Sequence, residues 1–449
     1  MNNIRDRAKQ FYNQLDFDKP IGFGDVELFK GSLSEEYYVA SIHGLGDRDP
    51  VQELADQIDF ADSAGAYLFT GNRGTGKTTE LLRLGRILQT NGCEVFYADM
   101  TDYLNMSQSI EVSDFLISLM GAFSEKVAER FGDDPGKPGF FERVWNFLKT
   151  TEVSFPEIKL PAGPVEFKVA LHENPTFRQA LQKGVRGYVE QLFKQAREFA
   201  LETVNRIRSR RGDENLKVVF IVDSVERLRG VGDNDDVREV FKSAETLFSA
   251  HADKLRFTGL SVVYTVPPYL QALAGALGAS YAGGRIYALP SVHIYQGKPK
   301  DGEPAIPYKD GLDKLVSIID KRYPQWRDFF KEGQLSRLAQ NSGGDLRDFF
   351  RMLRLVVTRA HRVDTLPFAD AVISDAEDAV RGDMLPIAKD DAQWLARVSK
   401  SHKAELDSLG DLTDFARLQQ GKYLLHYRNG EDWYDVHPLL RKEVHASGH

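Results

Sequence analysis

The chain has 449 residues, more than one ordinary hydrophobic core accommodates, and this length predicts two or three domains. Hydrophobic residues make up 42% and charged residues 28%, which is typical of a globular protein. The net charge of -8 argues against a generic nucleic-acid coat, although it permits a local basic patch. Cys93 is the only cysteine, which excludes an intramolecular disulfide and a cysteine-based zinc site.

The N-terminus does not have the pattern of a targeting segment. Residues 1–14 are polar and charged and lack the apolar core of a signal peptide. No stretch approaches the roughly 18 apolar residues that span a membrane. Together with the single cysteine, these features predict a cytoplasmic protein without a membrane partner.

The sequence pattern over residues 1–60 predicts an N-terminal helical segment. A polar helix is expected over residues 3–15, and Pro50 opens an amphipathic helix with a buried side formed by Leu54, Ile58 and Phe60.

From residue 61 to 305, short apolar runs alternate with helical stretches at 78–88 and 113–131. The runs that predict buried strands are residues 66–70, 94–98, 218–222, 260–265 and 286–289. This alternation predicts an α/β fold with a parallel sheet.

The stretch between the second and third predicted strands is too long for one crossover. Apolar and polar residues alternate at 153–155 and 165–169 around a Pro-Ala-Gly-Pro turn, which predicts a β-hairpin insertion over residues 151–171. A long helix is expected over residues 175–208.

A phosphate-binding loop follows the first predicted strand. Its residues fit the pattern Gly-x-x-x-x-Gly-Lys-Thr and are Gly71, Asn72, Arg73, Gly74, Thr75, Gly76, Lys77 and Thr78, with Thr79 next in the helix. The glycines allow successive N–H groups to turn inward, and the helix that follows directs its positive end at the phosphates. Lys77 is expected to bind the β- and γ-phosphates, and the hydroxyl of Thr78 is expected to bind Mg²⁺. The alternative is a chance glycine-rich turn before a helix.

An acidic residue at the end of a neighbouring strand must hold Mg²⁺ in such a site. Asp223 ends the run 218–222 and fits this role; alone, it would more simply cap the next turn. Glu226 lies three residues further on and is a candidate for orienting the attacking water. The alternative is that Glu226 is a solvated surface residue and turnover is slow.

Together these motifs resemble the AAA+ superfamily of ATPases, particularly its origin-recognition-like and STAND-like branches. Residues 223–228, Asp-Ser-Val-Glu-Arg-Leu, are similar to the Asp-Glu-x-Asp-x-Leu segment of origin-recognition ATPases, with Ser224 in place of the usual catalytic Glu. Thr265, at a strand end, matches the sensor-1 position. The resemblance covers residues 35–360 and implies that ATP and Mg²⁺ bind and that ATP is hydrolysed.

Residues 342–351, Ser-Gly-Gly-Asp-Leu-Arg-Asp-Phe-Phe-Arg, are similar to the sensor-2 helix of the AAA+ lid. The Gly-Gly-Asp sequence is also a helix-start signal, and the helix has an apolar stripe of Leu346, Phe349, Phe350 and Leu353. Arg347 lies beside this stripe, where its guanidinium could reach bound phosphates. The alternative is that Arg347 solvates the outer face.

Two further assignments follow from the resemblance. Arg285 is similar to an arginine finger offered to a neighbouring subunit, and the alternative is a loop arginine in water. Tyr37 and Tyr38 correspond to the N-terminal segment that contacts adenine, and they could equally belong to a core.

The C-terminal third is predicted to be a helical lid over residues 306–362 and a winged-helix-like domain over residues 363–449. Helical sequence is followed by a hairpin signal, Asn429-Gly430, between residues 423–427 and 432–436. Acidic residues crowd this hairpin, which favours a structural or protein-binding role over DNA binding. The basic run at 206–211 is expected to interact with the C-terminal end of its helix, and the alternative is a nucleic-acid contact.

Three functions compete. The first is an AAA+-type ATPase that assembles with copies of itself or with an operon-encoded effector protein, for which antiphage defence is an attractive context by association. The second is a DNA-binding initiator or loader. The third is a scaffold that binds ATP and hardly hydrolyses it.

Overall fold

The computed structural model describes residues 4–24, 31–43, 49–132, 137–150, 160–229, 234–362, 366–404, 406 and 411–447. The chain divides into two compact units. The first, the sheet unit, comprises Val51–Thr70 and Arg83–Tyr287. The second, the loop unit, comprises Met1–Pro50, Gly71–Leu82 and Ala288–His449.

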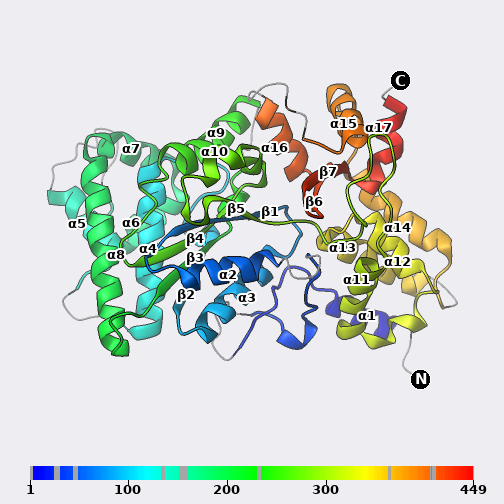
Figure 1. Cartoon of the computed structure of the whole chain (residues 1–449), viewed down its shortest axis with the longest axis horizontal. Helices are drawn as coiled ribbons and strands as arrows, with labels where there is room; N and C mark the ends of the chain where they lie inside the picture. Colours follow the sequence, from blue (N-terminus) through cyan, green and yellow to red (C-terminus); the bar gives the residue numbers. More distant parts are fainter. Residues whose placement is uncertain are drawn as a thin grey trace. The chain divides into compact units, whose positions relative to one another are not determined.

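The sheet has five strands in the order β2-β3-β4-β1-β5 (Figure 1). The strands are β1 (Ala66–Gly71), β2 (Glu94–Asp99), β3 (Val218–Asp223), β4 (Leu260–Val266) and β5 (Ile286–Leu289). The pairs β2–β3, β3–β4 and β4–β1 are parallel. Almost every strand residue is buried, as the continuous apolar runs predict for a sheet covered on both faces. The α/β fold with a parallel sheet is therefore confirmed.

Aromatic side chains join the sheet to its helices. The ring of Phe123 lies 5.6 Å from that of Phe96 on β2 and 5.3 Å from that of Phe220 on β3. Phe123 belongs to α4 (Val112–Phe131), which runs beside α8 (Val189–Arg211) in Figure 1. The sheet unit also contains α2 (Pro50–Phe60) from Val51 onward, α9 (Asn234–Ala250), α10 (Ala274–Gly278) and, from Arg83, the later part of α3 (Lys77–Thr90). In α2, Leu54 and Ile58 are buried as predicted, but Phe60 is 85% exposed, because the helix ends there.

The predicted β-hairpin insertion is wrong where the structure describes it. Residues 165–169 lie in α6 (Pro164–Glu173), which follows α5 (Phe140–Thr150). Gly163 is the N-cap and Pro164 the first helical residue, a position that proline favours, so the supposed turn is a helix start. Phe167 and Leu171 are buried four residues apart, while Val165 is 72% exposed. Residues 153–155 lie outside the described residues.

The long helix predicted over residues 175–208 is interrupted. It consists of α7 (Pro175–Val185), a short 3-10 turn and α8 (Val189–Arg211). Gly184 and Gly187 lie around this break, and glycine is among the residues least favourable to a helix interior.

The loop unit is mostly helical after residue 300. Its helices are α1 (Ile4–Gln14), α11 (Lys309–Arg322), α12 (Gln334–Asn341), α13 (Leu346–Thr358), α14 (Asp370–Gly382), α15 (Lys389–Ser401), α16 (Leu412–Gln420) and α17 (Arg441–Ser447). Strands β6 (Leu424–Arg428) and β7 (Asp432–Val436) form the predicted antiparallel hairpin. Gly430 has φ 95°, a left-handed conformation that suits this turn. In the part of the chain that the structure describes, no helix has the length and apolarity needed to cross a membrane.

Asp114 on α4 gives the sheet unit a dependence on pH. Burial raises the pKa of its carboxyl to about 7, while the guanidinium of Arg178 and the amide of Gln182 oppose that rise. A carboxyl with a raised folded-state pKa stabilises the fold while protonated, and this stability is lost as pH rises through about 7. We expect the free energy of unfolding to fall by about 2–3 kcal/mol between pH 5 and pH 8. Urea titrations of wild type and Asp114→Asn measure this, since the variant should lose most of the decline.

The control is Asp62→Asn, at an exposed position. It should keep the pH dependence of the wild type. An Asp114→Asn profile as steep as that of the wild type would contradict the assignment.

Candidate phosphate-binding site

The loop after β1 has the backbone of an anion nest. Gly74 has φ 95° and Gly76 has φ 87°, both in the left-handed region where only glycine is unstrained. Helix α3 begins at Lys77, directly after the second of these glycines. The order strand, glycine loop and helix N-terminus is the context that the motif requires, and it places N–H donors and a positive helix end together.

Two loop positions also leave no room for a side chain. A Cβ on Gly74 would lie 2.4 Å from the carboxylate Oδ2 of Asp345, and a Cβ on Gly71 would lie 2.7 Å from the carbonyl oxygen of Leu289. A contact this short forces the neighbouring atom to move: at Gly71 that atom belongs to the backbone, and at Gly74 to the buried carboxylate of Asp345. At Gly74 the positive φ also favours glycine. These neighbours come from the chain segment that begins at residue 288.

Lys77 and Asn72 give the loop its polar interior. Nζ of Lys77 donates to the carbonyl oxygens of Gly71, at 2.9 Å, and Asn72, at 3.0 Å. The Asn72 side chain is buried, and its Nδ2 and Oδ1 have no hydrogen-bond partner among the described residues. A buried amide without partners is costly and indicates a ligand or solvent that completes it. A buried ammonium, an unsatisfied amide and a nest of N–H groups form a donor set that fits a polyphosphate.

The N-terminal segment that precedes α2 supports the start of α3. The backbone N–H of Ile21 donates to Oγ1 of Thr79 at 3.1 Å. The hydroxyl of Tyr38 donates to Oε1 of Glu80 at 2.9 Å, and its ring packs edge-on against Phe23. Thr79 therefore anchors this segment. The expectation that Tyr37 and Tyr38 contact adenine stays a prediction.

Asp223 lies at the carboxyl end of β3 in the sheet unit. Its carboxylate accepts from the hydroxyl of Tyr97 at 2.8 Å and from the N–H of Ser224 at 2.6 Å. Burial, followed by the charge of Asp223, raises the pKa of Tyr97 well above its ordinary value, so the phenol stays protonated and donates. Asp99 faces Asp223 in the strand register, which places two carboxylates at one edge of the sheet. This is the donor chemistry that Mg²⁺ prefers.

Ser224 stands in a strained turn directly after Asp223. It has φ 69°, an uncommon conformation for a residue other than glycine, and its buried Oγ lacks a hydrogen-bond partner among the residues described. Oγ1 of Thr265 accepts from the N–H of Val225 at 3.0 Å and donates to the carbonyl of Val222 at 3.3 Å. Thr265 thus holds the turn that carries the half-buried Glu226.

The two arginines predicted to act on phosphate each contact a carboxylate of their own unit. Arg347 on α13 lies 3.1 Å from Asp18 and covers the ring of Phe17. Arg285 donates to Glu53 at 2.7 Å and stacks on Tyr287, with its side chain 52% exposed. Their roles as sensor 2 and arginine finger therefore stay predictions, and each would require an ion pair to open.

Sequence reasoning missed two residues beside the loop. The sequence pattern indicates Asp345 only as part of a helix start, and it gives Lys422 no role. Nζ of Lys422 lies 2.7 Å from Oδ1 of Asp345. No local pattern signals a contact between residues so far apart in the chain.

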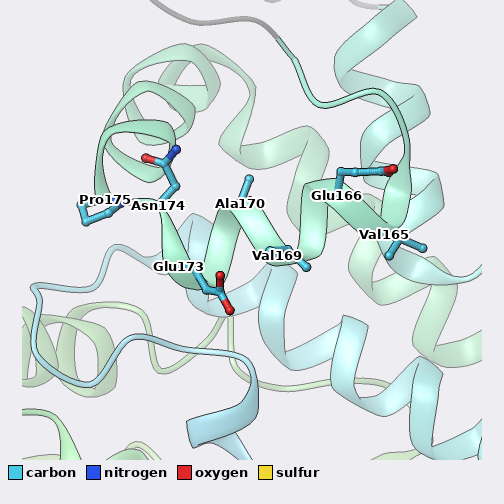
Figure 2. A pocket seen from close by; sticks show the side chains of 7 residues that line it. All are labelled: Val165, Glu166, Val169, Ala170, Glu173, Asn174 and Pro175. Atoms are coloured by element: carbon cyan, nitrogen blue, oxygen red, sulfur yellow. The ribbon is translucent and has the colours of Figure 1, made fainter.

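A separate hollow lies on α6, within the sheet unit. Figure 2 shows that its charged side chains are Glu166 and Glu173, and the exposed Val165 and Val169 line it as well. Two carboxylates repel phosphate, so this hollow does not suit a nucleotide.

No protein-family model matches the sequence, and no curated protein matches it. Solved structures are similar along most of the chain. Cdc6p from Pyrobaculum aerophilum is 14% identical and has a TM-score of 0.34, with 92% of this chain and 97% of that chain covered. ORC2 from Aeropyrum pernix is 10% identical and has a TM-score of 0.38, with 92% and 96% covered. The Thermotoga maritima RuvB branch migration motor is 12% identical and has a TM-score of 0.35, with 88% and 93% covered.

The space around Gly74 predicts that alanine at Gly74 and alanine at Gly92, two glycines of similar conformation, affect nucleotide affinity differently. Gly92 has φ 87°, and a Cβ added to it would have no neighbouring atom within 4 Å, whereas Gly74 is confined by Asp345. Gly92→Ala should cost about 1 kcal/mol of stability from backbone strain and should keep its nucleotide affinity. Gly74→Ala should lose nucleotide affinity at least tenfold, measured by titration with a fluorescent ADP analogue. Equal affinities of the two variants would contradict the steric argument.

Proposed function

We propose that the chain is an ATP-binding ATPase of the AAA+ type that couples binding and hydrolysis of Mg-ATP to conformational change and assembly. The observation that carries this proposal is the loop Gly71–Thr78, in which two left-handed glycines, a buried lysine and a helix N-terminus form one anion site.

The roles of the residues follow from their chemistry. Lys77 would exchange its carbonyl partners for phosphate oxygens, and Asn72 would gain a partner for its buried amide. Thr78 and Asp223 would hold Mg²⁺, which neutralises charge on the β- and γ-phosphate oxygens when bound. Tyr97 holds the carboxylate of Asp223 in place by its hydrogen bond.

A nucleotide-dependent scaffold with slow turnover is the second candidate, and Ser224 favours it. A serine with a buried hydroxyl occupies the position after Asp223, so Glu226 is left as the acidic side chain of this turn for orienting water. An initiator that grips duplex DNA is the third candidate. At the hairpin, Asp432 pairs with Arg428 and His426, which weakens a basic contact to phosphate.

Three variants separate these candidates. Lys77→Ala should abolish nucleotide binding, because the loop loses its only ammonium. Glu226→Gln should keep binding and lower the turnover number at least tenfold if this residue orients water. Arg227→Gln, at the exposed neighbouring position, is the control and should resemble wild type. Phosphate release and ADP binding are the measurements.

A Glu226→Gln enzyme with wild-type turnover would remove Glu226 from the mechanism. Tight ATP binding with negligible turnover in the wild type would support the scaffold. Duplex-DNA binding that weakens with salt would instead support the initiator.

Assembly gives a separate prediction. If Arg285 serves a neighbouring subunit, ATP should increase the mass of the wild type, measured by light scattering, and Arg285→Ala should keep ATP binding but lose turnover. Glu53→Gln removes the partner of Arg285 and leaves the arginine, so it should retain turnover. A monomer at all ATP concentrations would leave Arg285 no neighbour on which to act.

A further inference from the structure

The start of α13 touches the phosphate loop through a backbone hydrogen bond and a carboxylate. The N–H of Leu346 donates to the carbonyl oxygen of Gly74 at 3.1 Å. Asp345, the N-cap of α13, accepts from the N–H of Asp348 with its Oδ1 and is 1% exposed. Its other oxygen, Oδ2, faces Gly74 and lacks a hydrogen-bond partner among the described residues. A buried, partly unsatisfied carboxyl group therefore stands against the loop that we propose binds phosphate.

Lys422 supplies the positive charge for this carboxylate from the C-terminal end of the chain. Its Nζ lies 2.7 Å from Oδ1 of Asp345 and 3.1 Å from Oδ1 of Asp348, and the residue is 9% exposed. Lys422 has φ 62°, an uncommon conformation for a residue other than glycine, at the turn before β6. The hydroxyl of Tyr427 on β6 also donates to the carbonyl of Gly343, at 2.7 Å. The hairpin is thus joined to the start of α13 by two independent contacts.

Lys422 contributes positive charge beside the buried carboxyl groups of Asp345 and Asp348. Burial alone would raise the pKa of Asp348, but the nearby ring of His437, whose Nε2 lies 3.6 Å from Oδ2, and the ammonium of Lys422 lower it well below its ordinary value, so Asp348 is ionised. Burial raises the pKa of Asp345, and the charge of Lys422 opposes that rise. Withdrawing the ammonium would leave the carboxyl group of Asp345 without its cation beside Gly74, and negative charge there repels phosphate.

We propose that Lys422 is a positioning residue for nucleotide binding: by neutralising Asp345 it allows the loop at Gly74 to accept phosphate, so nucleotide affinity depends on the docking of the hairpin β6–β7 on α13. This inference rests on the proposed nucleotide-binding function. Because coupling between two binding events is reciprocal, bound nucleotide must strengthen the docking of the hairpin by the same factor. The C-terminal hairpin therefore responds to the occupancy of the phosphate loop without touching the nucleotide.

The test compares ADP affinity among charge variants of the full chain. Lys422→Met should bind ADP at least tenfold more weakly than wild type, and Lys422→Arg should retain most of the affinity. Lys442→Met removes a lysine at an exposed position of α17 and is the matched control, with unchanged affinity expected. Adding Asp345→Asn to Lys422→Met should restore affinity, because the uncompensated charge is then gone.

Asp345→Asn alone keeps an N-cap oxygen and tests the same charge if Lys422→Met fails to fold. It should bind ADP several-fold more tightly than wild type. A purely structural role for the pair predicts lower stability with unchanged ADP affinity in both variants, and that result would overturn the proposal.

Hydrogen exchange supplies a second readout. ADP should slow exchange of the backbone amides of β6 and β7 in wild type and not in Lys422→Met. Equal protection in both proteins would contradict the coupling. Failure of wild type itself to bind ADP would instead overturn the proposed function, and the two failures are therefore distinguishable.

Discussion

An anion-binding loop made of backbone N–H groups works only if its conformation is imposed from outside, since its glycines have little preference of their own. In this protein the constraint comes from Asp345 and Leu346 at the start of α13, which meet Gly74 through a carboxylate and a hydrogen bond. The other features of the loop unit follow from this contact. Asp345 must be buried to reach Gly74, a buried carboxylate needs a cation, and Lys422 supplies one at the cost of a left-handed backbone.

In the sheet unit, too, neighbouring residues hold a carboxylate in a fixed position. Asp223 is held by the phenol of Tyr97 and by the N–H of Ser224, and Thr265 fixes the turn that follows. These bonds orient the carboxylate of Asp223. In the ATPase that we propose, hydrolysis would depend on Glu226.

Local signals sufficed for much of this structure. The five strands, the phosphate loop and the terminal hairpin were predicted because each depends on a short pattern of apolar residues and glycines. The prediction of a β-hairpin insertion was wrong because a proline after a glycine can begin either a turn or a helix. Only the burial of Phe167 and Leu171 decides between the two. Lys422 was missed for another reason. Its partner lies 77 residues away, and nothing in the neighbouring sequence signals such a pairing.

The separation of these residues along the chain has a consequence for synthesis. Chains fold as they are made, from the N-terminus onward, and the phosphate loop is among the first segments to appear. Asp345 and Lys422, which we propose support and neutralise it, are made more than 250 residues later. A nascent chain that ends before Lys422 would therefore have the nucleotide motif without this support.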